Sequence, residues 1–437
     1  MAVVVIGAGV TGLTVALHCL RNGHRVTVLE KAGQVGGLCR SYHYDDFTFD
    51  VGPHRLFSGD PDIDRYFASI LGPDHVAVPR VSMVKLNGRY HEWPLNVKSV
   101  AGMSPGLMVR CMADLLGGRG RGDDVRTLKD YVMSRYGGTI YRTFWEGYTE
   151  KFLGLTCDRV DAEWGSLSVA RSVVDRERRP RGLPDLVRSV LHNSSNHLRF
   201  RYPSDGMGGF TDRLAARVRD AGGEIHLGAP ATALEHDGSR VVAVTADAGR
   251  IAADQFVWTG PLPELCRLAG RPAPDLRFLD LLLLNVEVDA EPAGRWQWIY
   301  FPDKRYVFSR VSRPCSFHRP MAPGGKTGIC VEITLPSGPA EADATDALER
   351  QTVTQLVEAG LLPSPAHARR IHREIVPDAY PIYRLGFRRD VDAAIEGLRP
   401  FGNLHLVGRG ARFEHDNIDE AVASARAVAS RLGPAGT

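Results

Sequence analysis

The chain has 437 residues, 43% of them hydrophobic and 24% charged, so it is long enough to form roughly two or three packed domains. Its formal net charge is only +3, with 47 arginines against seven lysines, which excludes a basic nucleic-acid-binding protein and suggests a GC-rich genome. The composition also excludes a disordered chain, a collagen-like repeat and a coiled coil. Seven cysteines without a Cys-x-x-Cys pair imply neither a disulfide framework nor a metal site, so we expect a reducing, cytoplasmic environment.

The first thirty residues predict a nucleotide-binding βαβ unit. A β-branched run at residues 3–6 is typical of a strand buried on both faces, and it leads directly into a Gly-x-Gly-x-x-Gly pattern and a helix. In such a unit Gly7 makes the tight turn, Gly9 lets the backbone approach a pyrophosphate, and Gly12 lets the helix pack on the strand. The second strand ends at Glu30, which is placed to accept hydrogen bonds from ribose hydroxyls.

This apolar N-terminal stretch does not predict a membrane segment. No basic residues precede it, and Gly7, Gly9, Gly12 and His18 interrupt it before the roughly 18 apolar residues that a spanning helix needs. We therefore expect a soluble protein.

A second glycine turn distinguishes between the two common dinucleotides. Gly36 and Gly37 follow Glu30 by about six residues and lead into Leu38 and Arg40. NAD-binding domains usually lack this turn, whereas in flavoproteins with two dinucleotide-binding domains it passes near the pyrophosphate and the flavin. The sequence therefore predicts FAD.

The rest of the chain alternates between strand-rich and helical stretches. An alternating stretch at 42–50 is followed by a hairpin at 83–93 around Asn87-Gly88. Helices are expected from 99 to about 174, interrupted by a glycine-rich surface loop at 117–122. The later elements are an antiparallel sheet within 279–335, a helix from about 342 to 359, a buried strand at 404–407 and a closing helix at 417–432.

These patterns predict an α/β fold with a discontinuous Rossmann-like FAD-binding domain. That domain is expected at residues 1–98, 203–270 and 396–437. A mainly helical insertion is expected at 99–202, and an antiparallel substrate-binding sheet at 271–395.

Five separated segments carry a resemblance that spans nearly the whole chain. With them the chain resembles the UDP-galactopyranose mutases and the protoporphyrinogen-oxidase-like FAD flavoproteins of glycan or antibiotic pathways. The segments are Tyr148-Thr149-Glu150-Lys151, Gly208-Gly209-Phe210-Thr211, Thr259-Gly260-Pro261, Tyr380-Pro381 and Gly408-Arg409.

The resemblance implies a non-redox use of FAD. In the mutases the flavin is reduced, and its N5 attacks the anomeric carbon of a nucleotide-diphosphate sugar, so that the ring opens and recloses between pyranose and furanose. The cofactor is the nucleophile, and the protein must stabilise the leaving diphosphate with guanidinium groups. A nucleotide sugar is thus the expected partner, with no nucleic acid, membrane or metal; the oligomeric state is left open, a homodimer included.

The resemblance assigns Arg171 and Arg310 to the diphosphate and Tyr380 to the substrate. The alternatives are a surface salt bridge for each arginine and a core position for the tyrosine. His54 follows a Gly-Pro turn near the cofactor, where it either hydrogen-bonds flavin or substrate or is a structural histidine. His415 is either a proton shuttle or, with Asp416, a cap of the closing helix.

Two departures from the mutase pattern support other functions. Phe57 replaces a histidine that lies near the flavin in the family, and His415 replaces a diphosphate-binding tyrosine. A genuine FAD-dependent oxidoreductase acting on a sugar or amine-type substrate is therefore the main alternative, and a flavoprotein without turnover is a third. Trp145 and Trp164 either stack on a nucleotide base or belong to the core.

Cofactor contacts are expected along the whole chain. The expected residues are Gly7, Gly9, Val10, Thr11, Gly12, Glu30, Lys31, Gly36, Gly37, Leu38, Arg40, His54, Ala231, Thr259, Gly260, Gly408, Arg409, Asn417 and Ile418.

Overall fold

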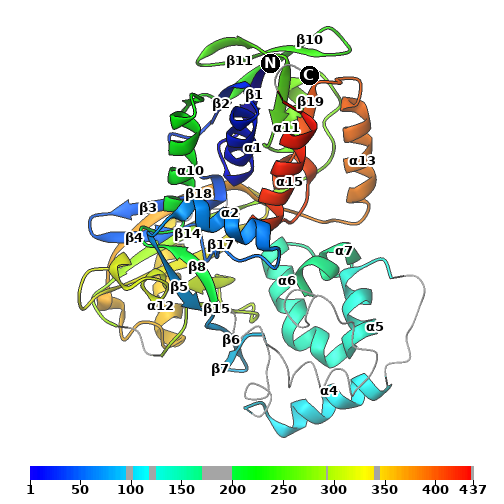
Figure 1. Cartoon of the computed structure of the whole chain (residues 1–437). Helices are drawn as coiled ribbons and strands as arrows, with labels where there is room; N and C mark the ends of the chain where they lie inside the picture. The colour runs from blue at the N-terminus through cyan, green and yellow to red at the C-terminus, as the bar shows by residue number, and fades with distance from the viewer. Residues whose placement is uncertain (95–101, 118–124, 170–198, 292–293, 339–344, 435–437) are drawn as a thin grey trace.

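The computed structural model describes residues 1–94, 102–117, 125–169, 199–291, 294–338 and 345–434. Arg171 and most of the predicted glycine-rich loop at 117–122 lie outside these residues. Figure 1 shows a parallel sheet with its helices at the top, a second sheet below it to the left and a group of helices below it to the right.

The parallel sheet forms because its strands are apolar on both faces. Val3 and Val5 of the first strand pack into one core and Val4 and Ile6 into another, as the two-residue period of a strand requires. Segments from both ends of the chain meet in this sheet. In spatial order the strands are β19 (Leu404–Leu406), β13 (Gln255–Trp258), β1 (Ala2–Ile6), β2 (Arg25–Leu29) and β9 (Glu224–His226).

Helices cover one face of the parallel sheet, and a small antiparallel sheet with further helices covers the other. The first face carries α1 (Val10–Arg21), α10 (Gly208–Asp220) and α15 (Ile418–Arg431), with α2 (Pro61–Leu71) packed against the last two. The second face carries β10 (Ala231–His236), β11 (Val241–Ala246), β12 (Gly249–Ala252), α11 (Leu262–Leu268) and α13 (Phe387–Leu398). α14 (Arg409–Arg412) lies between β19 and α15 in the chain.

The second sheet has seven strands and packs α12 (Thr345–Glu358) against one face. All its pairs are antiparallel except β15 with β6. β6 and β7, which the sequence analysis grouped with the nucleotide-binding segments, are hydrogen-bonded into this sheet instead. Its strands in order are β18 (Ala368–Pro381), β14 (Phe278–Val288), β17 (Thr327–Leu335), β16 (Arg310–Ser312), β15 (Trp298–Tyr300), β6 (Ser82–Leu86) and β7 (Arg89–Glu92).

The helical group and two short hairpins complete the fold. The helices are α4 (Pro105–Gly117), α5 (Leu128–Ile140), α6 (Glu146–Leu153) and α7 (Ala162–Trp164), with π-helical turns at Tyr141–Trp145 and Gly165–Val169. The two-stranded pairs are β3 (Ser41–Tyr44) with β4 (Phe47–Asp50), and β5 (His75–Pro79) with β8 (Arg199–Pro203).

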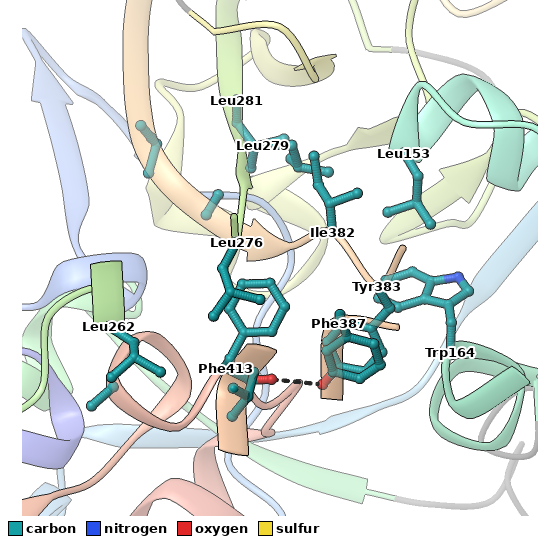
Figure 2. Packing of buried hydrophobic residues seen from close by; sticks show 14 of the residues in the cluster. Leu153, Trp164, Leu262, Leu276, Leu279, Leu281, Ile382, Tyr383, Phe387 and Phe413 are labelled. Atoms are coloured by element: carbon teal, nitrogen blue, oxygen red, sulfur yellow. Dashed lines mark hydrogen bonds between the residues drawn. The ribbon is translucent and has the colours of Figure 1, made fainter. Parts of the chain in front are cut away.

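One apolar cluster joins all three groups of elements. Figure 2 shows Leu153 and Trp164 of the helical group facing Tyr383 and Phe387, with Phe413 beside them. The Tyr383 hydroxyl donates a hydrogen bond of 3.1 Å to the Phe413 carbonyl. Because these residues are 0–4% exposed, the helical group is held firmly against the rest of the molecule, and the cleft between the groups has a defined shape.

Candidate functional site

The first glycine turn is built for a close backbone approach by a ligand. Gly7 has φ of +106°, and a Cβ there would lie 2.1 Å from Thr259 Oγ1. At Gly12 a Cβ would lie 1.9 Å from the Gly7 carbonyl oxygen, so helix α1 could not pack as it does. A Cβ at Gly9 would meet no atom within 4 Å, because this backbone faces open space at the N-terminus of α1. The turn therefore fits a pyrophosphate.

The second glycine turn is fastened to the first. The Gly36 N–H donates to the Ala8 carbonyl oxygen at 2.9 Å, and Gly9 pairs with Gly36 in an isolated parallel bridge. The Glu30 carboxylate accepts from the backbone N–H groups of Ala8 (2.7 Å) and Ala32 (2.9 Å). Since a carboxylate has about four acceptor positions, Glu30 can also accept from ribose hydroxyls.

The ends of β13 and β19 supply the opposite wall. The Thr259 hydroxyl donates to the Ile6 carbonyl oxygen at 2.8 Å, and a Cβ at Gly408 would lie 3.0 Å from the Thr11 hydroxyl. Arg409 donates to the carbonyl oxygens of Ala379 (3.1 Å) and Asp416 (2.6 Å). These contacts fix the segment that leads to α15.

The N-terminal cap of α15 differs from one alternative that the sequence left open, a cap formed by His415 with Asp416. Asn417, not His415 with Asp416, is the N-cap residue, and Asn417 and Glu420 form a capping box. His415 instead packs its ring against Tyr380 (5.4 Å between centroids) and Trp164 (5.2 Å).

These segments enclose a cleft of about 840 Å³. It is large enough for a ligand of cofactor size together with a substrate. Predicted residues that line it are Gly7, Gly9, Val10, Thr11, Glu30, Lys31, Gly36, Gly37, Leu38, Arg40, His54, Ala231, Thr259, Gly260, Arg310, Tyr380, Arg409, His415, Asn417 and Ile418. Gly12 and Gly408 lie behind the lining, and Arg171 is outside the described residues.

Arg310 is held in the cleft by a buried ion pair. Its Nε and Nη2 donate to the two carboxylate oxygens of Glu332 at 2.5 and 2.6 Å, and Nη2 lies 3.5 Å from the Tyr380 hydroxyl. The Glu332 side chain is 1% exposed, and it approaches so closely because Gly52 has no side chain: a Cβ there would lie 2.8 Å from Oε1. Glu332 was not predicted from the sequence, although a single acid in the apolar strand β17 indicates a buried partner.

His54 is kept neutral. Its Nδ1 is buried and has no hydrogen-bond partner within the described residues. Burial, and then the charges of Arg310 and Arg409, lower the pKa of His54 to about 3. At neutral pH its ring is the uncharged imidazole, which can hydrogen-bond a ligand but cannot act as a general acid.

This neutral histidine predicts a measurable acid sensitivity. Between pH of about 6.5 and about 3 the unfolded chain binds a proton at His54 and the folded chain does not. The free energy of unfolding should therefore fall by about 1.4 kcal/mol per pH unit as the pH decreases through this window, and the His54→Gln variant should lack this component. Urea unfolding of both proteins at neutral and mildly acidic pH measures the difference; parallel curves would contradict the assignment.

The two tryptophans considered for base stacking belong to the core. Trp145 is 6% and Trp164 is 4% exposed, although both reach the lining of the cleft. Trp164 packs against Phe152 and Tyr383. Neither indole presents a free face of the size that a nucleotide base would cover.

Lys151 fastens the helical group to the loop that precedes β16. Its Nζ donates to the carbonyl oxygens of Phe301 (2.6 Å), Asp303 (3.0 Å), Tyr306 (3.3 Å) and Phe308 (2.8 Å). Burial lowers the pKa of Lys151 to about 7, while the carbonyl oxygens favour the ammonium form. This loop leads directly to Arg310, so Lys151 helps to position it.

Several other cleft residues were not predicted from the sequence. Arg55 and Arg80 lie in the lining, with Trp93, Trp298 and Tyr300. Within the described ranges, no group of three or more histidine, cysteine or acidic side chains is arranged to hold a metal ion. A search of the same residues finds no helix with the length and apolar character needed to cross a bilayer.

Residues 10–433 match the family of flavin containing amine oxidoreductases. The chain belongs to this family. Membership implies a flavin cofactor, and the glycine turns, Glu30 and the open backbone at Gly9 fit one. The protein is therefore an enzyme of a flavin oxidoreductase family.

The chain is similar to one curated relative over part of its length and to solved structures over nearly all of it. The phytoene dehydrogenase of Streptomyces griseus is 26% identical over 287 residues, which are 62% of this chain and 56% of that protein; the match thus spans about half of the relative. The structure of reduced UDP-galactopyranose mutase has a TM-score of 0.84 at 20% identity, covering 100% of this chain and 96% of that one. A protoporphyrinogen-oxidase-like protein from Exiguobacterium sp. 255-15 has a TM-score of 0.77 at 17% identity, covering 99% and 98%. These structures show the fold and confirm the predicted fold class and family resemblance.

Proposed function

We propose that this flavoenzyme binds FAD and, with the flavin reduced, interconverts the pyranose and furanose forms of a nucleotide-diphosphate sugar. The observation that carries this proposal is the position of Arg310, oriented by Glu332 and lying beside Tyr380 in the cleft. Nε and Nη2 hold Glu332, and within the described residues no protein group accepts from the Nη1 hydrogens. These remain for an anionic ligand.

The chain's own residues would share the work around the cofactor. Reduced flavin supplies a nucleophile for the anomeric carbon. Arg310 would stabilise the negative charge of the leaving diphosphate, and Tyr380 would orient it. Neutral His54 would hydrogen-bond without supplying a proton. The whole-length similarity to the mutase fold supports this assignment.

An oxidoreductase is the second candidate, acting on a sugar or an amine-type substrate in glycan or secondary-metabolite biosynthesis. The family match and the dehydrogenase relative favour it. Phe57, which lines the cleft, offers no hydrogen bond where the mutase pattern has histidine. In this reading FAD, held by the two glycine turns and Glu30, would supply the hydride acceptor.

One pair of incubations separates these functions. FAD-loaded protein, reduced with dithionite, is expected to convert UDP-galactopyranose or another nucleotide sugar to its ring isomer, detected by chromatography, and the oxidised protein is expected to be inactive. Equal activity in both redox states would contradict the mutase mechanism. Stoichiometric bleaching of the oxidised flavin by a sugar or amine in the absence of oxygen would instead establish the oxidoreductase.

A further inference from the structure

Three cations of the cleft are already engaged by the protein. Arg310 forms its ion pair with Glu332, and Lys31 lies 3.4 Å from the Asp378 carboxylate. Arg409 is engaged with two backbone carbonyl oxygens and the ring of Tyr380. Carboxylates thus offset the charges of Arg310 and Lys31, which leaves Arg310 only its Nη1 hydrogens for a ligand, and neutral carbonyl oxygens hold Arg409 in place.

Arg80 is different. It lies between β5 and β6, lines the cleft and is partly buried. Its Nε donates to the Ser82 hydroxyl at 3.2 Å, and its guanidinium lies over the Trp298 ring at 5.6 Å from the centroid. Within the described part of the chain no carboxylate pairs with it, so both Nη groups remain without an anionic partner.

The surroundings of Arg80 make this arrangement costly without a ligand. Burial, together with the positive charge of neighbouring Arg55, lowers the pKa of Arg80 to about 10. The Trp298 side chain beneath it is 5% exposed, and the indole N–H has no acceptor within the described residues. One negatively charged ligand group beside Arg80 would offset both its unpaired charge and its repulsion from Arg55.

We propose that Arg80 binds an anionic group of the substrate, a phosphate or a carboxylate, and thereby restricts this cleft to anionic substrates. A cationic amine would be repelled by Arg80 and Arg55, and a hydrocarbon would leave the guanidinium desolvated and unpaired. This inference rests on the proposed function only in that the cleft is the substrate site of a flavoenzyme; it holds for either reaction.

The test is a binding measurement on the FAD-loaded, oxidised protein, without turnover. Isothermal titration calorimetry with UDP and with citrate separates a phosphate from a carboxylate ligand. Arg80→Gln is expected to weaken binding of at least one probe by about 10- to 100-fold, the loss of a charge-assisted hydrogen-bonding pair. Arg89→Gln is the matched control, because Arg89 is exposed on β7 and lies outside the cleft lining; it should change the dissociation constant less than about twofold.

Clear results would overturn the proposal. The proposal is wrong if neither probe binds the wild-type protein at millimolar concentration. It is also wrong if Arg80→Gln and Arg89→Gln change the dissociation constants equally. If Arg80→Gln does not retain FAD, Arg80→Lys carries the test: it keeps the charge but loses the planar fork, so weaker binding with normal FAD content supports the proposal and unchanged binding contradicts it. Ring isomerisation with an unchanged KM in the Arg80 variant would refute this inference alone, and Arg80-dependent binding without isomerisation would refute only the mutase.

Discussion

A methyl group on Gly9 is expected to weaken FAD binding by about 10- to 100-fold while leaving the fold intact. The Gly9 backbone has φ of −75°, which alanine adopts readily, and the added Cβ would meet no protein atom within 4 Å. It would project into the space where the pyrophosphate must approach the backbone. Fluorescence titration of the apoprotein with FAD measures the loss.

Gly33→Ala provides the matched control for Gly9→Ala. Gly33 lies in the loop after β2, and its Cβ would also meet nothing within 4 Å, but it is not part of the cleft lining. Both apoproteins should be as stable as the wild type, or more stable by up to about 1 kcal/mol, because alanine restricts the unfolded chain. If Gly33→Ala loses FAD affinity equally, or Gly9→Ala retains it, the first glycine turn is not the pyrophosphate site.

Removal of one partner of the Arg310–Glu332 pair should be among the most destabilising substitutions in the molecule. Glu332→Ala leaves a guanidinium whose side chain is 15% exposed without its counterion, at an expected cost of about 3–5 kcal/mol in the free energy of unfolding. Substituting both residues, as Arg310→Met with Glu332→Leu, removes both charges and should cost less than Glu332→Ala. Urea unfolding of the apoproteins measures these values.

An exposed ion pair serves as the control for the Arg310 and Glu332 substitutions. Arg250 and Glu235 pair on the surface of the small sheet with side chains 55% and 42% exposed, so Glu235→Ala should cost less than about 1 kcal/mol. Equal effects of Glu332→Ala and Glu235→Ala would show that the cleft pair is solvated. A double variant as unstable as Glu332→Ala would show that packing, and not the unpaired charge, sets the cost.

The features that were predictable from the sequence are those with local causes. Gly7, Gly9 and Gly12 lie within six residues, and the conformation of each follows from its spacing between one strand and one helix. The Asn87-Gly88 turn likewise predicted the β6–β7 hairpin, because a two-residue turn fixes the pairing of its own strands.

The features that escaped prediction depend on distant residues. Gly52 matters because Glu332, 280 positions later, occupies the space where its side chain would be. The hairpin's place in the seven-stranded sheet depends on the pairing of Ser82 with Trp298, which no local pattern encodes. Arg80 could be recognised only from the structure, which places it in the cleft over the Trp298 ring without a carboxylate partner among the described residues.

The order of strands in the parallel sheet has a consequence for biosynthesis. β1 and β2 leave the ribosome first, but Thr259, Arg409 and the start of α15, which complete their ligand-binding edge, are encoded hundreds of residues later. The glycine turns of a nascent chain therefore have no opposite wall, and long-range pairing of this kind forms slowly. We therefore expect FAD to bind only after β13, β19 and the start of α15 have been synthesised, and fragments lacking β19 and α15 should be recovered colourless.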